Sequence, residues 1–300
     1  MLMESIPKSG SARSPRIAQV TDLHLSREFP LFLLNWEILA ERLRELAPEL
    51  VLVTGDLGLS DPDRERDLVF ARERLDALGL PWIAIPGNHD IGETLRHGHE
   101  SKHPIVTTDR RMRFVRHFGE DGWTRTLGDW LLLGLNAQLL GSGLPDEAEH
   151  RRWIEDSLAA HTGETVLIAS HKTLYSTEGG ADEPGWAIPA PESRWLEGLL
   201  SRFRTKVLIS GHLHREKRYT HAGVDCIWAP STAFFASHPR IEKRKGKLRV
   251  GALLLTLSVN SVEVEHVGDD RLIEHDVRNW FNPGVNALWR IVNEPSPFLR

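Results

Sequence analysis

Residues of the types that bind metal ions recur directly after short apolar runs of this sequence. The runs are rich in β-branched residues and bounded by Gly and Pro, so they predict buried strands at 17–20, 50–53, 82–85, 165–169 and 207–209. Ligands of α/β sheets bind at the carboxyl ends of the strands, where neighbouring strands bring distant residues together. The residues expected to meet there are Asp22, His24, Asp56, Asn88, His89, Asp90, His171, His212 and His214.

These side chains combine carboxylate, amide and imidazole groups, a mixture that suits Mn, Fe, Zn or Co better than Ca. Asp22 and His24 are separated by one residue, and such side chains point to the same side of a strand, so both could bind one ion. His212 and His214 have the same spacing. The two carboxylate oxygens of Asp56 could bridge two ions. The sequence therefore predicts a site for two metal ions whose identity it leaves open.

The charge of such a site favours a phosphate substrate. Two divalent ions bring four positive charges; Asp22 and Asp56 would cancel two and a bridging hydroxide one, which leaves one net positive charge. Two ions roughly 3.5–4 Å apart clamp the attacking and leaving oxygens of an in-line displacement, and metal binding lowers the pKa of water from about 15.7 to near 7. The predicted chemistry is hydrolysis without a Ser or Cys nucleophile.

The intervening segments predict the elements that position these residues. Apolar residues at helical spacing predict a helix over Trp36–Leu46, and the N-cap and N1 pair Asp61-Pro62 predicts the start of a second helix. Strands that alternate with helices in this way predict a mainly parallel first sheet. Further helices are predicted at 110–118, 146–161 and 192–203, and a strand at 130–135. After His214 we expect an antiparallel section packed beside the first sheet, with strands at 217–221, 224–228, 250–257 and 261–266.

Composition limits the class of protein. The chain has 300 residues and a net charge of −5, so charge disfavours nucleic acid as a partner. Its apolar runs are shorter than the roughly 18–20 residues that span a bilayer. Cys226 is the single cysteine, so an intrachain disulfide is excluded, a cytoplasmic setting is favoured and the thiol is expected to fill the core.

The expected organisation has three parts. Residues 1–15 are polar and predict a flexible tail, and residues 16–268 form one domain. Residues 269–300 carry aromatic side chains and three prolines, so we expect an extension that packs on the domain or on a second subunit of a homo-oligomer.

The motifs, taken in order, resemble the calcineurin-like metallophosphoesterases. They are Asp-x-His, Gly-Asp, Gly-Asn-His-Asp, a His after a strand, and Gly-His-x-His, between residues 17 and 214. Thr21–Leu25, Pro86–Asp90 and Gly211–His214 are most similar to the class III cyclic-nucleotide phosphodiesterases. The resemblance implies an α/β (α+β) fold, a four-layer αββα sandwich of two mixed β-sheets flanked by helices, with a dinuclear metal site at the C-terminal ends of strands.

The resemblance also implies a role for each residue. One metal would be held by Asp22, His24 and His214, and the other by Asn88, His171 and His212, with Asp56 bridging them. His89 would face the phosphoryl group and protonate the leaving oxygen, and Asp90 would orient His89. The implied reaction is hydrolysis of a small phosphodiester, such as a 3′,5′-cyclic nucleotide, through a metal-bridging hydroxide.

Two segments depart from the family's usual form. Ser170-His171-Lys172-Thr173 stands where His-Pro or His-Lys-Pro is expected, and the histidines at 97, 99 and 103 lie outside the common motifs. His99–His103 also matches the zinc-protease pattern His-Glu-x-x-His, which requires a helix. Because Gly98 precedes and Pro104 follows, we interpret this segment as a surface loop that could cover the substrate.

Other functions share the same ligands. A phosphomonoesterase or a nucleotide or lipid pyrophosphatase would use the same residues, and a nuclease is disfavoured by the acidic balance. A non-catalytic binding scaffold would tolerate loss of His89 or Asp56, and this chain retains both.

Overall fold

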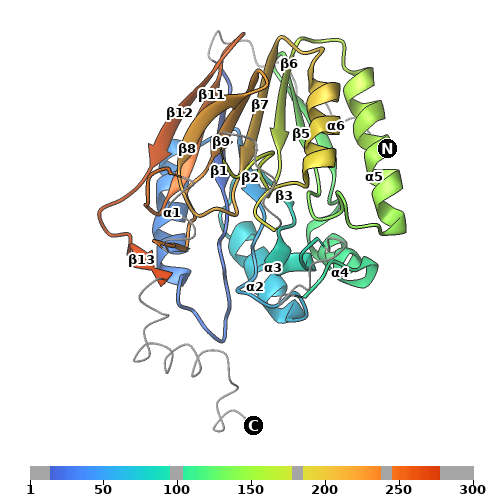
Figure 1. Cartoon of the computed structure of the whole chain (residues 1–300). Helices are drawn as coiled ribbons and strands as arrows, with labels where there is room; N and C mark the ends of the chain where they lie inside the picture. Colours follow the sequence, from blue (N-terminus) through green and yellow to red (C-terminus); the bar gives the residue numbers. More distant parts are fainter. Residues whose placement is uncertain (1–13, 95–103, 178–184, 238–244, 278–300) are drawn as a thin grey trace.

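The structure, a computed structural model, describes residues 14–94, 104–177, 185–237 and 245–277 (Figure 1). Several sequence predictions therefore lie outside the described residues. They are most of the tail at 1–15, the histidine-rich segment at 97–103, and the extension beyond residue 277.

Two mixed sheets form the centre of the molecule (Figure 1). The first has the order β12-β11-β1-β2-β3 and contains β1 (Arg16–Val20), β2 (Leu50–Thr54), β3 (Trp82–Ile85), β11 (Ala252–Leu257) and β12 (Val262–Val267). The second has the order β4-β5-β6-β7-β9-β8 and contains β4 (Trp123–Leu127), β5 (Trp130–Gly134), β6 (Thr165–Ala169), β7 (Thr205–Ser210), β8 (Lys217–His221) and β9 (Val224–Trp228). A short pair joins β10 (Phe234–Phe235) to β13 (His275–Asp276).

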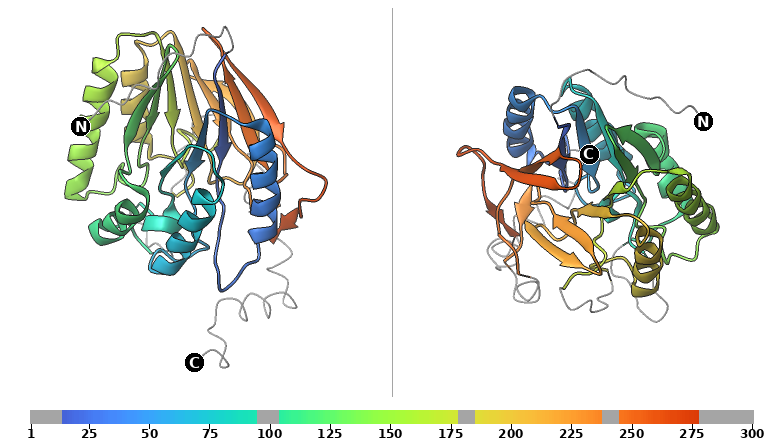
Figure 2. Two further views of the ribbon diagram at one scale, coloured as in Figure 1. Left: turned by 180° about the vertical axis from the view of Figure 1, so that it is seen from behind. Right: turned by 90° about the horizontal axis from the view of Figure 1, so that it is seen from above.

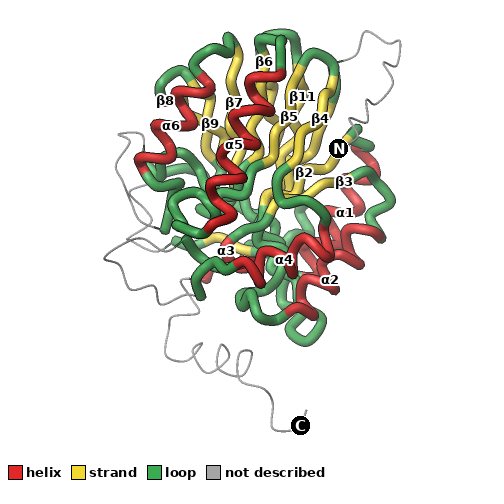
Figure 3. The backbone as a smooth tube through the Cα atoms, turned by 90° about the vertical axis from the view of Figure 1, so that its right-hand side faces the viewer, coloured by secondary structure: helices red, strands yellow, loops and turns green. Residues whose placement is uncertain are grey.

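Six helices complete the described elements of the chain. They are α1 (Leu33–Leu46), α2 (Glu65–Asp76), α3 (Asn88–Ile91), α4 (Thr108–Phe118), α5 (Pro145–Ala160) and α6 (Ala190–Leu200). Figure 3 shows α5 and α6 in front of the strands of the second sheet, and Figure 2 shows α1 on the opposite side of the molecule from α5.

Alternation along the strands produces four layers. In β1, Ile17 belongs to the apolar cluster between the two sheets, whereas Ala18 and Val20 belong to the cluster under α1 and α2. In β6, Leu167 faces the first sheet and Ile168 faces α5 and α6. Because both faces of the central strands β2, β5 and β6 are covered, these strands read as continuous apolar runs. The predicted αββα sandwich is confirmed.

The strands after His214 differ from the prediction of a separate antiparallel section. β8 and β9 join the second sheet, where β9 pairs parallel with β7, and β11 and β12 join the first sheet, where β11 pairs antiparallel with β1. The β8–β9 hairpin extends one edge of the second sheet, and the β11–β12 hairpin extends one edge of the first. The C-terminal part of the chain therefore contributes strands to both sheets.

The predicted start of the second helix is wrong. The Asp61 carboxylate accepts the backbone N–H of Asp63 at 2.9 Å, and the N–H of Arg64 donates to the Asp61 carbonyl at 3.0 Å. These bonds close a turn, so α2 begins at Glu65 rather than at Pro62.

The described part of the C-terminal extension packs on the domain. Leu272 contacts the apolar cluster under α1, and the amide of Asn35 in α1 binds both the carbonyl and the N–H of Ile273. Among the described helices, none has the length and apolar character needed to cross a membrane.

A buried histidine links α5 to the end of β5. Nε2 of His150 accepts the backbone N–H of Asn136 at 3.1 Å, and the residue is 6% exposed. Burial lowers its pKa from 6.5 to about 4, although the charge of Asp121 acts in the opposite direction. The folded protein therefore keeps this ring neutral at a pH at which the unfolded chain protonates it.

The free energy of unfolding should consequently decrease as the pH is lowered from about 6.5 to about 4. The contribution of His150 is fully present above about pH 6.5 and is lost as pH falls towards 4, by about 3 kcal/mol in total. Urea unfolding of the wild type and of His150→Gln, which keeps an acceptor but does not titrate, should show a steeper loss for the wild type. Equal slopes between pH 6.5 and 4 would contradict this assignment.

Candidate metal centre

Loops at the carboxyl ends of five strands carry the predicted ligands. Described groups that could hold a cation form two sets whose ligand atoms lie within 4.8 Å of one another. The first set is Asp22, His24, Asp56 and His214, and the second is Asp56, His171 and His212. Asn88 joins the second set, because its Oδ1 lies 3.0 Å from Nε2 of His171.

Asp56 lies at the centre of the site. Its Oδ2 is 3.4 Å from Nε2 of His171, 4.0 Å from Nε2 of His24 and 3.9 Å from Nε2 of His89. The other oxygen, Oδ1, accepts the backbone N–H of His89 at 2.8 Å. This hydrogen bond fixes the carboxylate, so that Oδ2 faces both sets of ligands.

The backbone at the ligands is unusual. Eight described non-glycine residues have positive φ, and five of them are predicted ligands: Asp22, His24, Asp56, His212 and His214. The left-handed region costs a non-glycine residue of order 1–3 kcal/mol and is concentrated at functional sites. The ligands therefore do not continue the strands, contrary to the geometry assumed for their spacing.

This conformation changes which ligands share a set. Asp22 and His24 do fall in one set, as the spacing predicts, but His212 and His214 fall in different sets. The one-residue spacing therefore does not place His212 and His214 at the same ion. The family resemblance assigns these two histidines to different ions, in agreement with the two sets.

Two glycines allow the close approach of the loops. A Cβ atom on Gly87 would lie 2.2 Å from Oδ1 of Asp56, and one on Gly211 would lie 2.0 Å from the Thr21 hydroxyl and 2.5 Å from Oδ2 of Asp22. The glycines before Asn88 and His212 are thus required because ligand side chains occupy the space of a side chain there.

Backbone carbonyls orient the histidines. Nδ1 of His24, His171 and His214 lies 2.7–2.8 Å from the carbonyls of Leu59, Thr54 and Phe234, respectively. A ring that donates through Nδ1 presents the lone pair of Nε2 to the centre, as metal-binding histidines commonly do. In His212 the pattern is reversed, because Nε2 lies 2.7 Å from the carbonyl of Gly185, which leaves Nδ1 as the available ligand.

A buried imidazole nitrogen without a hydrogen-bond partner and two buried carboxylates show whether the site suits metal ions. Nε2 of His24 is buried and has no hydrogen-bond partner, although its ring is fixed from the other side. Asp22 and Asp56 are 0% and 1% exposed. Buried carboxylates require compensating positive charge, and an imidazole nitrogen without a hydrogen-bond partner beside them is suited to bind a metal ion. The residues fit a pair of cations.

Neighbouring groups control the ionisation of the two carboxylates. Burial acts to raise both pKa values, but His214 brings the pKa of Asp22 down to about 2, and His171 and His89 hold that of Asp56 well below its ordinary value. Burial acts to lower the pKa of His171, yet Asp56 raises it to about 9. The centre thus holds two buried anions whose charge is balanced by neighbouring imidazoles. Bound cations would supply this compensating positive charge instead.

Two histidines of the ligand sets, His24 and His212, stay neutral. Burial lowers the pKa of His24 and of His212 to about 3. A neutral imidazole is the form that binds a metal ion, so both rings are ready to act as ligands.

The predicted orientation of His89 by Asp90 is not what the structure shows. Nδ1 of His89 lies 2.8 Å from the carbonyl of Ser60. The Asp90 carboxylate instead accepts the backbone N–H groups of Leu57, Gly58 and Gly87 at 2.8–3.0 Å. Asp90 therefore shapes the loop that carries Asp56. Burial and the charge of Asp56 raise its pKa to about 7.

Sequence reasoning missed two features beside the ligands. The ring of Phe234 lies 4.8 Å from that of His24 and 4.3 Å from that of His214. Lys172, noted only as a departure from the family form, is 1% exposed and forms an ion pair with Glu93. A Lys directly after a ligand, in a segment that departs from the usual form, was the available signal for the second feature.

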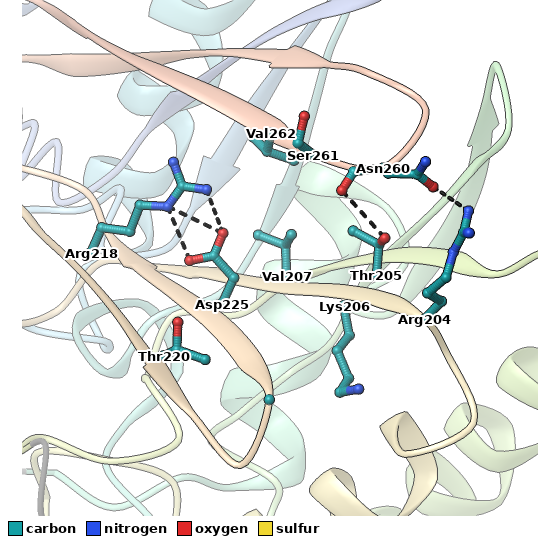
Figure 4. A pocket seen from close by; sticks show the side chains of 11 residues that line it. Arg204, Thr205, Lys206, Val207, Arg218, Thr220, Asp225, Asn260, Ser261 and Val262 are labelled. Atoms are coloured by element: carbon teal, nitrogen blue, oxygen red, sulfur yellow. Dashed lines mark hydrogen bonds and ion pairs between the residues drawn. The ribbon is translucent and has the colours of Figure 1, made fainter.

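A polar hollow lies at the other end of the second sheet (Figure 4). It has a volume of about 370 Å³ and is lined by Arg204, Thr205, Lys206, Val207, Arg218, Thr220, Gly223, Asp225, Asn260, Ser261 and Val262. These residues include the start of β7, whereas the ligands follow its end. Arg218 is already paired with Asp225, and Arg204 with Glu164. The hollow is therefore separate from the metal centre.

Comparison with known proteins agrees with this geometry. The model of the family described as calcineurin-like phosphoesterase matches residues 15–216. A probable cyclic nucleotide phosphodiesterase from Psychrobacter arcticus is 27% identical over 237 residues, which are 73% of this chain and 80% of that protein. A protein from Danio rerio named as a serine/threonine-protein phosphatase is 27% identical over 194 residues, which are 60% of this chain and 58% of that protein.

The fold also has solved relatives. A dimetal phosphatase structure from Danio rerio superposes with a TM-score of 0.57 at 14% identity, covering 87% of this chain and 98% of that one. At this identity the likeness concerns the fold alone.

Proposed function

This chain belongs to the calcineurin-like phosphoesterase family of dimetal hydrolases, and on that premise we propose that it hydrolyses phosphodiesters of small molecules such as 3′,5′-cyclic nucleotides. The observation that carries the proposal is the shared position of Asp56 in two adjoining sets of ligands. The relative from Psychrobacter arcticus, named a probable cyclic nucleotide phosphodiesterase, supports the substrate class.

The ligand roles follow the two sets. Asp22, His24 and His214 would hold one ion and Asn88, His171 and His212 the other, with Asp56 shared. Mn, Fe, Zn and Co all suit these groups. When bound, such ions supply Lewis acidity towards a phosphoryl oxygen and lower the pKa of water to near 7.

The protein itself provides charge and orientation for the substrate. Only two carboxylates, Asp22 and Asp56, belong to the described ligand sets, so two divalent ions would leave the site positive and attractive to an anion. The neutral amide of Asn88 preserves this positive charge. The carbonyls that fix the imidazoles keep the ligands in place before the substrate arrives.

His89 is the residue that we assign to substrate contact. Its side chain is 27% exposed, whereas the side chain of Asp56 is 1% exposed and that of His171 is fully buried. Because Nδ1 faces the carbonyl of Ser60, Nε2 points to the centre, 3.9 Å from Oδ2 of Asp56. A proton on Nε2 would hydrogen-bond a phosphoryl oxygen and then pass to the leaving oxygen.

A phosphomonoesterase is the second candidate, because the relative from Danio rerio is named a protein phosphatase. A cytoplasmic setting and a homo-oligomer through residues 269–300 stay predictions.

A substrate panel distinguishes the candidates. Metal-stripped protein, and the same protein after Mn²⁺ is restored, are assayed with a bis-aryl phosphate, an aryl monophosphate and 3′,5′-cyclic AMP. We expect turnover only after metal is restored, and faster turnover of the two diesters. Preference for the monoester would support the phosphatase instead, and two bound ions with no turnover of any substrate would indicate a binding scaffold.

Replacement of His89 tests its role in proton transfer. His89→Ala should lower kcat about 10²- to 10⁴-fold, the range typical of general acids, or roughly 3–5 kcal/mol of barrier. Metal content, measured by elemental analysis, should stay at the wild-type value because His89 is not a ligand. A rate within twofold of the wild type would remove the assigned role.

A further inference from the structure

A buried ion pair lies beside the second set of ligands. Nζ of Lys172 donates to Oε1 of Glu93, and these residues are 1% and 9% exposed. The same carboxylate oxygen accepts the backbone N–H of Thr94 at 2.8 Å. Lys172 is among the largest fully buried side chains of the described structure, so its charge is poorly screened by water.

The pair joins the two loops that supply this set. Lys172 directly follows His171 after β6, and Glu93 follows α3, whose first residue is Asn88. The ammonium group therefore belongs to the residue next to the ligand His171, whose Nε2 lies 3.0 Å from Oδ1 of Asn88. The ion pair thus ties together the loops that carry two ligands of the second set and lies beside that set.

The two sets differ in their own charge. The first contains the carboxylates of Asp22 and Asp56, whereas Asp56 is the one carboxylate of the second, beside two imidazoles and an amide. A single extra charge therefore changes the balance of the second set more than that of the first. In a buried environment such a charge acts over several ångströms.

We propose that the Lys172–Glu93 pair sets the cation affinity of the second ligand set, with Glu93 offsetting a lysine charge that would otherwise repel the ion. Glu93 and Lys172 are positioning residues here, since neither belongs to the described ligand sets. The inference rests on the proposed metal centre. It assigns a role to the lysine of the segment Ser170-His171-Lys172-Thr173, which departs from the usual His-Pro or His-Lys-Pro form.

The sign of the effect separates this role from a purely structural one. If the pair only tied the two loops together, loss of either partner would weaken binding of the ion. If its charge matters, Glu93→Gln leaves a buried cation and weakens binding, whereas Lys172→Met leaves a buried anion and strengthens it.

Calorimetric titration of Mn²⁺ into metal-stripped protein measures both binding steps. Asn88→Ala marks the step that belongs to the second set, because it removes a ligand of that set. At this step we expect Glu93→Gln to weaken binding about 10- to 100-fold, the range known for groups that support ligands. Lys172→Met should tighten it about tenfold. Weakening by both variants, or no change in either, would overturn the proposal.

The double variant Glu93→Gln/Lys172→Met keeps the test decisive if a single variant does not fold. It leaves no net buried charge, so the second step should stay within about threefold of the wild type, and a loss above about tenfold would overturn the proposal. Matched charge changes at the distant hollow, Arg218→Met and Asp225→Asn, should leave both steps unchanged.

The same titration separates failure of this inference from failure of the proposed function. Wild-type protein that binds fewer than two Mn²⁺ ions would reject the metal centre and the inference with it. Two bound ions whose affinities do not respond to Glu93 or Lys172 would reject the inference alone.

Discussion

Two carboxylates buried at the end of a sheet are the constraint on which the rest of the site depends. Asp22 and Asp56 are almost completely removed from water and remain ionised. A buried anion is tolerated only with compensating charge and hydrogen bonds. Around these two groups the chain places four imidazoles of the ligand sets, the imidazole of His89 and several backbone N–H groups, an arrangement suited to hold cations.

The fold contributes the direction from which each ligand arrives. β1, β2 and β3 of the first sheet, and β6 and β7 of the second, end on the same side of the sandwich, so ligands from both sheets meet there. Left-handed backbone at five ligands turns the chain out of the strands, and small residues such as Gly87 and Gly211 let the loops approach. The apolar core beneath these loops, supplied by both sheets, is what sustains this local strain.

The sequence was sufficient for most of the elements and for the motif residues, because both follow from local pattern. It did not predict β4, whose central residues are not buried. Apolar runs covered on both faces predicted the strands, and ordered Asp, Asn and His motifs indicated which residues meet. The assignment of the C-terminal hairpins to two different sheets could not be predicted, since strand pattern carries no information about the neighbouring strand. The start of α2 was misplaced because the Asp61 side chain closes a turn that competes with a helix N-cap.

The chemistry around the ligands was less accessible from sequence for a similar reason. The acceptors for the histidines are backbone carbonyls, which every residue possesses, so no residue type marks Ser60 or Thr54. The role assigned to Asp90 failed because a carboxylate next to His89 in sequence bonds to the loop of Asp56 instead. The pairing of Lys172 with Glu93, 79 residues away, depends on the folded arrangement of two loops.

The most direct test of the account is anomalous diffraction from crystals of the protein loaded with Mn²⁺. It predicts two anomalous peaks roughly 3.5–4 Å apart, one on each side of the Asp56 carboxylate, with His24 and His214 at one peak and His171 and His212 at the other. A single peak, or peaks remote from Asp56, would contradict the central claim.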